Sequence, residues 1–262
     1  MTQHLRVDRD GPFARVTLAR PEVRNAFNAA LIEELRLTFE EFSGEAPESL
    51  RGVVLAGDGP TFSAGADVDW MRDAMTLGVE ENETDATAMQ AMFAAIDACP
   101  VPVIARVQGA ALGGGMGLCA VRDIVVATAE ATFGFTETRL GIIPAVISTF
   151  VLPKIGESHA RALFATGQRF DAARAQRIGL VHEVVADEAA LDATVAALLD
   201  ELRAAGPIAM RAAKALVRTI GEVGPNRARG LTPALIARHR TSAEGQEGLI
   251  AFLEKRPPGW RG

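Results

Sequence analysis

The feature that most constrains this chain is a pair of junctions at which a buried strand runs into a loop of small residues. The first reads VVLAGDGPTFSAGADV over residues 53–68, and the second reads PVIARVQGAALGGGMG over residues 102–117. A glycine inside a helix or strand costs about 0.5–1 kcal/mol relative to alanine, so the glycines indicate that another group approaches this backbone closely. Amide N–H groups at a helix start have no partner within the helix. Two such amides that converge on one point would form a site for an anion or an oxyanion.

Either junction alone is compatible with a close-packed turn, but two of them, each after a buried strand, favour a functional site. The rest of the chain alternates apolar runs with helical periods, which predicts an α/β fold. A hairpin is expected around the Asp10-Gly11-Pro12 turn, with further strands at 51–57, 102–108, 123–128, 131–135 and 180–185. Helices are expected at 29–42 with Asn28 as N-cap, at 86–99, as a short buried helix after the glycines, and over most of the chain from 144 onward.

Two further organisational features follow from the pattern. The acidic, aperiodic segment 76–84 is expected to be a mobile surface loop. The chain is expected to divide into a core over residues 1–195, which holds the site, and a C-terminal helical region over residues 196–262.

Composition excludes several classes of function. The 262 residues carry a net charge of −6 without a long basic run, so neither nucleic acid nor an anionic membrane is expected as a partner. Cys99 and Cys119 stand in no metal-ligand or disulfide pattern, so we expect no metal site and a reducing, cytoplasmic location. No run reaches the roughly 18–20 apolar residues of a membrane span, and the polar N-terminus has no apolar signal-peptide segment.

The best-placed ionisable residue is Glu137, in FGFTETRLGIIPA, which follows a strand and has apolar residues on both sides. A carboxyl that is partly removed from water has a raised pKa and can exchange protons near neutral pH. The alternative is a solvated glutamate that pairs with Arg139.

Other catalytic patterns are absent from the sequence. A serine hydrolase needs a histidine within reach of its nucleophile, but Ser63 stands in FSAGA rather than in a GxSxG motif. The four histidines, at positions 4, 159, 182 and 239, have no partner motif. Neither the P-loop motif GxxxxGK[ST] nor the Rossmann motif GxGxxG is matched.

Five segments, in this order and spacing, resemble the crotonase (enoyl-CoA hydratase/isomerase) superfamily. They are RPEVRNAFN (20–28), TFSAGADVDWM (61–71), ARVQGAALGGGMGLCAVRDIVVA (105–127), ATFGFTETRLGIIPA (131–145) and GQEGLIAFLEKRPPGW (245–260). The resemblance implies a crotonase (ClpP-like) spiral of ββα units whose C-terminal helices mediate a homotrimer or a dimer of trimers. It also implies an acyl-CoA thioester as substrate and no separate cofactor.

The resemblance further assigns roles to individual residues. The thioester oxygen would sit between the backbone amides of Ala66 and Gly114, and Glu137 would be the catalytic acid–base. CoA would contact Arg24 and the segment that holds Ala64, Asp67 and Val68. The C-terminal motif implies that Phe252 and Lys255 complete the CoA pocket, in some relatives on a neighbouring subunit. In many relatives a lysine stands where this chain has Asp69. A charge contact from this position to a CoA phosphate is therefore not expected in this chain.

One position departs from the hydratases of this family, which place two glutamates around one water. The first of those positions is Gly117 in this chain. We expect a 2-enoyl-CoA hydratase that works mainly with Glu137, with ordered water or a substrate group in place of the missing carboxyl. One candidate is a branched, carboxylated substrate such as 3-methylglutaconyl-CoA. The carboxylate of such a substrate would occupy the space that Gly117 leaves, near Arg139 or Lys154. The alternatives are a Δ3,Δ2-enoyl-CoA isomerase, which needs one base and an oxyanion hole, and a weakly catalytic CoA-binding scaffold.

Overall fold

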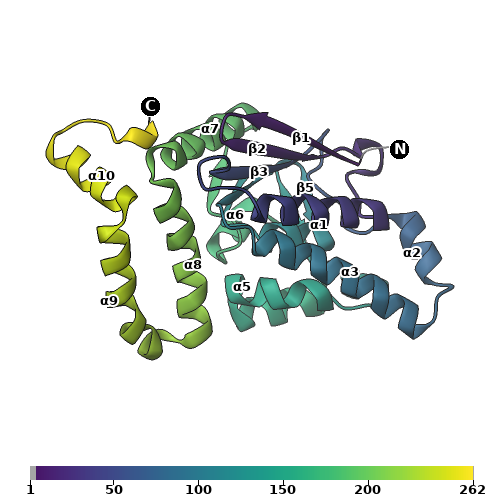
Figure 1. The fold of residues 1–262 in the computed structure, drawn as a ribbon. Helices are drawn as coiled ribbons and strands as arrows, with labels where there is room; N and C mark the ends of the chain where they lie inside the picture. Colours follow the sequence, from purple (N-terminus) through teal and green to yellow (C-terminus); the bar gives the residue numbers. More distant parts are fainter. Residues whose placement is uncertain (1–3, 262) are drawn as a thin grey trace.

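The main sheet of the computed structural model, which describes residues 4–261, has six strands (Figure 1). Its spatial order is β1 (Leu5–Asp10), β2 (Phe13–Leu18), β3 (Gly52–Gly57), β4 (Val103–Val107), β6 (Ile124–Thr128) and β9 (Glu183–Val185). β1 and β2 pair antiparallel, which confirms the predicted hairpin, and all later neighbours are parallel. Every residue of β3 and β4 is buried, because parallel strands are covered on both faces.

A second, smaller sheet contains three strands of three residues each. Its order is β5 (Ala110–Leu112), β7 (Thr132–Gly134) and β8 (Arg169–Asp171), with β5 and β7 parallel and β8 antiparallel to β7. Strands β5 and β8 were not predicted from the sequence, because three residues are too few to show the alternation of a strand.

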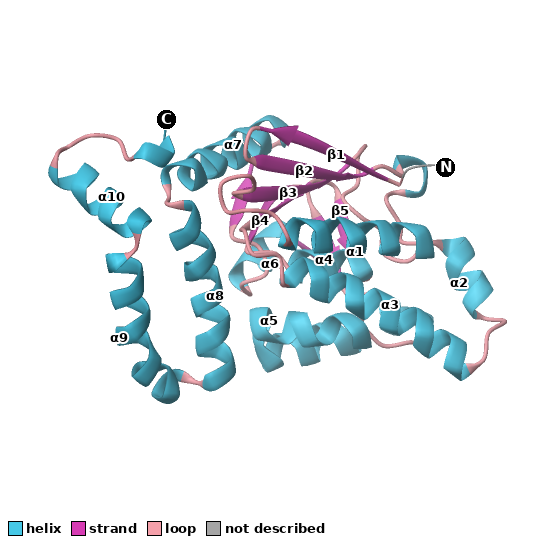
Figure 2. Cartoon of the chain, in the orientation of Figure 1, coloured by secondary structure: helices cyan, strands magenta, loops and turns pink. Residues whose placement is uncertain are grey.

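Helices cover the sheets, as Figure 2 shows. Those that precede the C-terminal region are η1 (Pro21–Val23), α1 (Ala29–Ser43), α2 (Val68–Ala74), α3 (Val79–Asp97), α4 (Gly114–Ala120), η2 (Glu137–Leu140), α5 (Ala145–Thr166), α6 (Ala172–Arg177) and α7 (Glu188–Ala204). Asn28 caps α1 as predicted, since its side chain accepts a hydrogen bond from the Leu31 amide at 2.9 Å. The short, buried helix predicted after the glycines is α4.

The expectation of a loop over residues 76–84 is wrong from Val79 onward, where α3 begins. The Glu81 carboxylate accepts a hydrogen bond from the Gly78 amide at 2.6 Å and so closes the first turn. Two acidic residues in that turn, Glu80 and Glu81, also face the positive end of the helix dipole. The acidic residues that suggested a loop therefore stabilise a helix start.

Helix α7 packs on the main sheet along its length, through Leu191, Val195 and Leu199. The predicted boundary between residues 195 and 196 falls within this helix, and the division into a core and a C-terminal helical region stays a prediction. That region contains α8 (Pro207–Val223), α9 (Pro225–Thr241), α10 (Ala243–Leu253) and η3 (Gly259–Arg261). Figure 1 shows α9 and α10 standing away from the sheets. Among residues 4–261, no helix is both long and apolar enough to cross a membrane.

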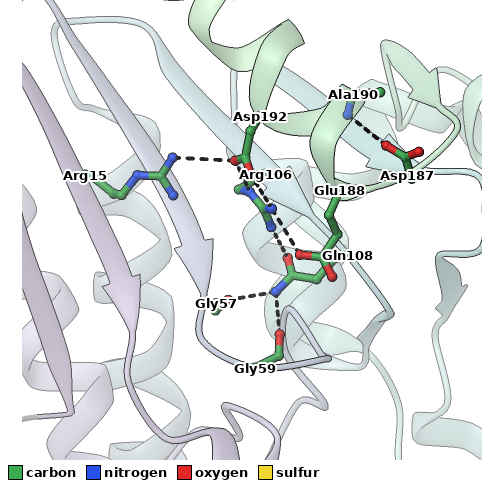
Figure 3. Close-up of polar contacts among 9 residues, drawn as sticks. All are labelled: Arg15, Gly57, Gly59, Arg106, Gln108, Asp187, Glu188, Ala190 and Asp192. Carbon is green, nitrogen blue, oxygen red and sulfur yellow. Dashed lines mark hydrogen bonds and ion pairs between the residues drawn. The ribbon is translucent and has the colours of Figure 1, made fainter.

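A polar network joins α7, the main sheet and the first junction (Figure 3). The buried Arg106 of β4 donates to Asp192 at 2.7 and 3.0 Å, to Glu188 at 3.1 Å, and to the Gln108 side-chain oxygen at 3.1 Å. The Gln108 amide donates in turn to the carbonyls of Gly57 at 2.7 Å and Gly59 at 2.9 Å. The turn at Gly57 and Gly59, within the first junction, is thereby fixed to the end of β4.

Arg51 tests how the C-terminal region is attached, because its buried guanidinium donates to the carbonyls of Leu202, Arg203, Ala205 and Trp260. Replacing it with methionine removes the donor from these four carbonyls, which are part-buried. We expect Arg51→Met to lower the free energy of unfolding by about 2–4 kcal/mol, measured by urea denaturation. The control is a methionine at Arg161, whose side chain is 80% exposed; equal effects would contradict the role of Arg51.

Candidate active site

Three chain segments meet side by side at the edge where both junctions end. The Ser63 amide donates to the carbonyl of Ala110 at 3.0 Å, and the Leu112 amide donates to the carbonyl of Ser63 at 3.0 Å. On the other side of β5, Leu112 pairs in register with Gly134 of β7. The Gly113 amide extends this pairing to the Gly134 carbonyl at 2.9 Å. The two small-residue loops and the residues that follow β7 therefore emerge together.

The two loops touch through their backbones, and this contact requires glycine. Gly65 has φ of +92°, and a Cβ there would lie 2.8 Å from the carbonyl of Leu112 and 3.3 Å from the Gly114 nitrogen. A Cβ on Gly114 would lie 2.6 Å from the ring of Phe27. A side chain at Gly65 would therefore push the loops apart, and one at Gly114 would displace the ring of Phe27.

Ala66 and Gly114 each carry an amide N–H that donates no hydrogen bond within residues 4–261. Both residues line the same cavity, which has a volume of about 370 Å³. Free amide donors on the wall of a mainly apolar cavity are suited to an oxygen that carries partial negative charge. The structure thus brings together the two amides that the sequence singled out.

Glu137 is the first residue of η2, immediately after the segment that follows β7, and it lines the same cavity. A Cβ on Gly113 would lie 3.6 Å from its Oε1, so the carboxyl faces the glycine loop. Its Oε2 is buried and accepts no hydrogen bond within the described residues. Burial raises the pKa of Glu137 above its ordinary value. The alternative pairing with Arg139 is not formed in the described part of the chain.

The cavity walls are mainly apolar, with Phe27, Trp70, Met71, Met89, Ile142 and Ile147 among the side chains that form them. The polar side chains on the walls are Asn82, Asp85, Thr136 and Glu137, and none of the described residues that line the cavity is Lys, Arg or His. A cavity of this size and polarity suits a small apolar group with a few polar contacts.

Of the residues assigned to CoA, Arg24 and Ala64 lie together. The Arg24 carbonyl accepts a hydrogen bond from the Ala64 amide at 2.9 Å, with Arg24 in the left-handed region at φ 57°. Ala64 lines the cavity, and Arg24 and Val68 are exposed beside it.

Asp67, also expected to contact CoA, stabilises the loop and the start of α2. Its carboxylate pairs with Arg20 at 2.8 Å and accepts the Asp69 amide at 2.9 Å as the N-cap of α2. Burial by itself would raise the pKa of Asp67, but the Asp69 amide and the Arg20 guanidinium hold it below its ordinary value. Because its backbone amide also donates to Phe27 at 2.8 Å, Asp67 has little left to offer a ligand.

The C-terminal residues Phe252 and Lys255 do not line the cavity of this chain. Phe252 lies near the end of α10 and is 80% exposed. Figure 1 shows α10 and α2, which forms part of the cavity wall, at opposite ends of the molecule. A role for these two residues at a CoA site would therefore require the site of another copy.

The expectation that a substrate carboxylate occupies the space at Gly117 is wrong, because the structure leaves no room there. The residue is buried, and a Cβ there would lie 2.5 Å from Ile147 Cγ2 and 2.6 Å from Phe93 Cζ. Nor do Arg139 and Lys154 line the cavity; the Lys154 ammonium donates to the carbonyl of Arg122 at 2.9 Å. The expected place for a substrate carboxylate is thus filled by core side chains.

Asn82 and Asp85 were not among the residues expected at the site, because Asn82 falls in the loop predicted over 76–84 and Asp85 lies between that loop and the helix predicted over 86–99. Once α3 begins at Val79, residues 82, 85, 86 and 89 recur at helical spacing on one face. That spacing is the signal that could have found them.

Substitution of Gly117 tests the tight packing around it. We expect Gly117→Ala to lower the free energy of unfolding by about 1–3 kcal/mol, because an added methyl group must displace Phe93 and Ile147. Gly221→Ala on α8 is the matched control, since a Cβ there would point into open space, and it should be neutral or stabilising. Thermal melts of both variants decide the matter; an undisturbed Gly117→Ala would contradict the packing described here.

Comparison with known proteins extends over nearly the whole chain. A family model described as Enoyl-CoA hydratase/isomerase matches residues 9–262. Enoyl-CoA hydratase AKT6-1 of Alternaria alternata is 38% identical over 249 residues, which cover 92% of this chain and 78% of that protein. Among solved structures, Pseudomonas aeruginosa AtuE has a TM-score of 0.94 and 38% identity, covering 99% of this chain and 100% of its own. An enoyl-CoA hydratase from Shewanella pealeana has a TM-score of 0.92 and 37% identity, covering 98% and 96%. With this fold and this cavity, the protein belongs to the enoyl-CoA hydratase/isomerase family, within the crotonase superfamily.

Proposed function

We propose that this enzyme adds water reversibly to the double bond of a 2-enoyl-CoA, as a carbon–oxygen lyase. The observation that carries the proposal is that two free amides, of Ala66 and Gly114, share an apolar cavity with the partly desolvated carboxyl of Glu137. The names of several relatives, such as the Alternaria hydratase, support the same reaction.

The amides act as an oxyanion hole for the thioester oxygen. Hydration forms a C–O bond at C3 and a C–H bond at C2, and negative charge develops on the thioester oxygen before C2 is protonated. Donors aimed at that oxygen stabilise the charged state more than the substrate, and one such donor contributes on the order of 10²–10³ in rate. Because burial raises the pKa of Glu137, its carboxyl holds a proton to a higher pH than an exposed glutamate does, and it can give that proton to C2.

The isomerase alternative is favoured by one specific observation. Gly117 supplies no second carboxyl, and Phe93 and Ile147 fill the space beside it. Movement of a proton between C2 and C4 needs only Glu137 and the oxyanion hole. The scaffold alternative has no comparable support, since the chain belongs to a family of enzymes.

The acyl chain that this cavity favours is apolar. A distal carboxylate, as in 3-methylglutaconyl-CoA, would meet two acidic side chains and no basic one among the described residues that line it. The CoA part would lie along Ala64, which lines the cavity, and the exposed Arg24 beside it. Phe252 and Lys255 are proposed to complete the site of a neighbouring copy in a homotrimer or dimer of trimers. The exposed apolar side chains of α9 and α10, such as Ile236 and Leu253, support such an assembly.

Replacement of Glu137 by glutamine tests the proposal directly. We expect Glu137→Gln to lower kcat for hydration by about 10²–10⁴-fold and to leave CoA affinity nearly unchanged, because shape and polarity are kept. The assay follows a panel of straight, branched and carboxylated enoyl-CoAs by mass spectrometry, which separates hydrated products from isomers. Glu130→Gln, at an exposed turn, is the control. If the wild type hydrates no 2-enoyl-CoA but converts a 3-enoyl-CoA to its 2-isomer, the hydratase proposal fails and the isomerase alternative holds.

The raised pKa of Glu137 also predicts a dependence of stability on pH. The carboxyl of Glu137 binds its proton more tightly in the folded chain than in the unfolded chain. The stability that this proton contributes is full below the unfolded pKa of 4.5, and it is lost as the pH rises through the higher folded pKa. Glutamine cannot ionise. We therefore expect Glu137→Gln to melt at a higher temperature than the wild type near neutral pH, and the gain to shrink at about pH 4. A gain that is the same at both pH values would show that ionisation is not its cause.

A further inference from the structure

A second carboxylate, that of Asp85 on α3, lies on the wall of the same cavity. Asp85 is half-buried, and no hydrogen bond or ion pair within residues 4–261 engages its side chain. Nearby acidic residues differ in this respect: Asp67 pairs with Arg20, and Asp69 pairs with Arg72 at 2.5 Å. A carboxylate beside an apolar cavity, with both oxygens free, is available to a ligand.

The face of α3 fixes where Asp85 stands relative to the rest of the site. Asp85 and Met89 line the cavity, and Phe93, two turns beyond Asp85, fills the space beside Gly117. At 1.5 Å per residue, Asp85 lies about 12 Å along the helix axis from Phe93. Burial falls along the same face, from the fully buried Phe93 to the half-buried Asp85. Asp85 therefore lies toward the open end of the α3 wall, and Glu137 comes from a different wall, at η2.

The other polar side chains of the cavity cannot supply a second acid–base group. The Asn82 amide donates to the carbonyls of Ala74, Leu77 and Gly78 at 3.2, 3.2 and 2.9 Å, so it fixes the start of α3. Thr136 offers a hydroxyl, which is neither acid nor base near neutral pH. The position on α4 where relatives of hydratase type carry a glutamate is closed by core side chains, as described above for Gly117.

We propose that Asp85 is the second acid–base group of the hydration reaction and that it replaces, from α3, the carboxyl that α4 lacks. This inference rests on the proposed function. The water oxygen bonds to C3 while the Asp85 carboxylate takes one of its protons. The electron pair of the double bond moves through the thioester to the oxyanion hole, and the Glu137 carboxyl gives its proton to C2. Transfer of the proton from Asp85 to Glu137 through solvent in the open cavity restores both groups.

The experiment separates the two carboxyl groups by two readouts. Hydration of crotonyl-CoA requires both groups. Exchange of the C2 protons of butyryl-CoA with D2O, followed by NMR, requires only Glu137 and the oxyanion hole. For Asp85→Asn we expect kcat for hydration to fall about 10²–10⁴-fold with little change in KM, while C2 exchange stays within a few-fold of the wild type. Asp85→Glu should recover part of the hydration rate.

Two matched variants frame the result. Glu83→Gln changes the same charge on an exposed position of the same helix and should leave both readouts unchanged, whereas Glu137→Gln should lose both. Hydration at the wild-type rate in Asp85→Asn would overturn the role of Asp85, and so would a parallel loss of hydration and exchange, which indicates a structural role. A wild-type enzyme that exchanges C2 protons but hydrates no 2-enoyl-CoA would instead overturn the proposed function itself.

Discussion

The site depends on one contact, the approach of two loop backbones at Gly65 and Gly114 with no side chain between them. This contact is possible because Ser63, β5 and β7 lie side by side in register, so that three segments end at the same edge. The core network of Arg106 and Gln108 holds the preceding turn to β4. Amide direction is thereby set by backbone pairing, which is more rigid than a side chain and costs no reorganisation when charge develops.

Burial divides the acidic residues around this contact into different roles. Asp67 is compensated by an arginine and an amide, so its charge stabilises the loop and the start of α2. Glu137 has a buried oxygen without a donor, and its pKa rises. The first arrangement favours structure and the second favours proton transfer, because a buried carboxyl without a compensating partner has a raised pKa, which suits an acid–base group. The chain therefore tolerates an unfavourable charge where the proposed chemistry needs it.

Much of the fold could be predicted from local patterns. The hairpin, the buried strands and the Asn28 cap follow from alternation, apolar runs and capping chemistry. The start of α3 was missed, since its acidic first turn resembles a loop when the tertiary partner is unknown. The three-residue strands were missed because their stability comes from neighbours and not from their own pattern.

The sequence by itself determined the features that depend on backbone freedom and residue chemistry, which are the two glycine junctions and a glutamate, Glu137, after a buried strand; its five motifs indicated the family. Tertiary structure alone decided what stands opposite them. Phe93 and Ile147 fill the space at Gly117, Asp85 reaches the cavity from α3, and Phe252 lies far from it. These outcomes depend on contacts between segments distant along the chain, and spacing within one segment carries no record of which distant side chain fills a given volume.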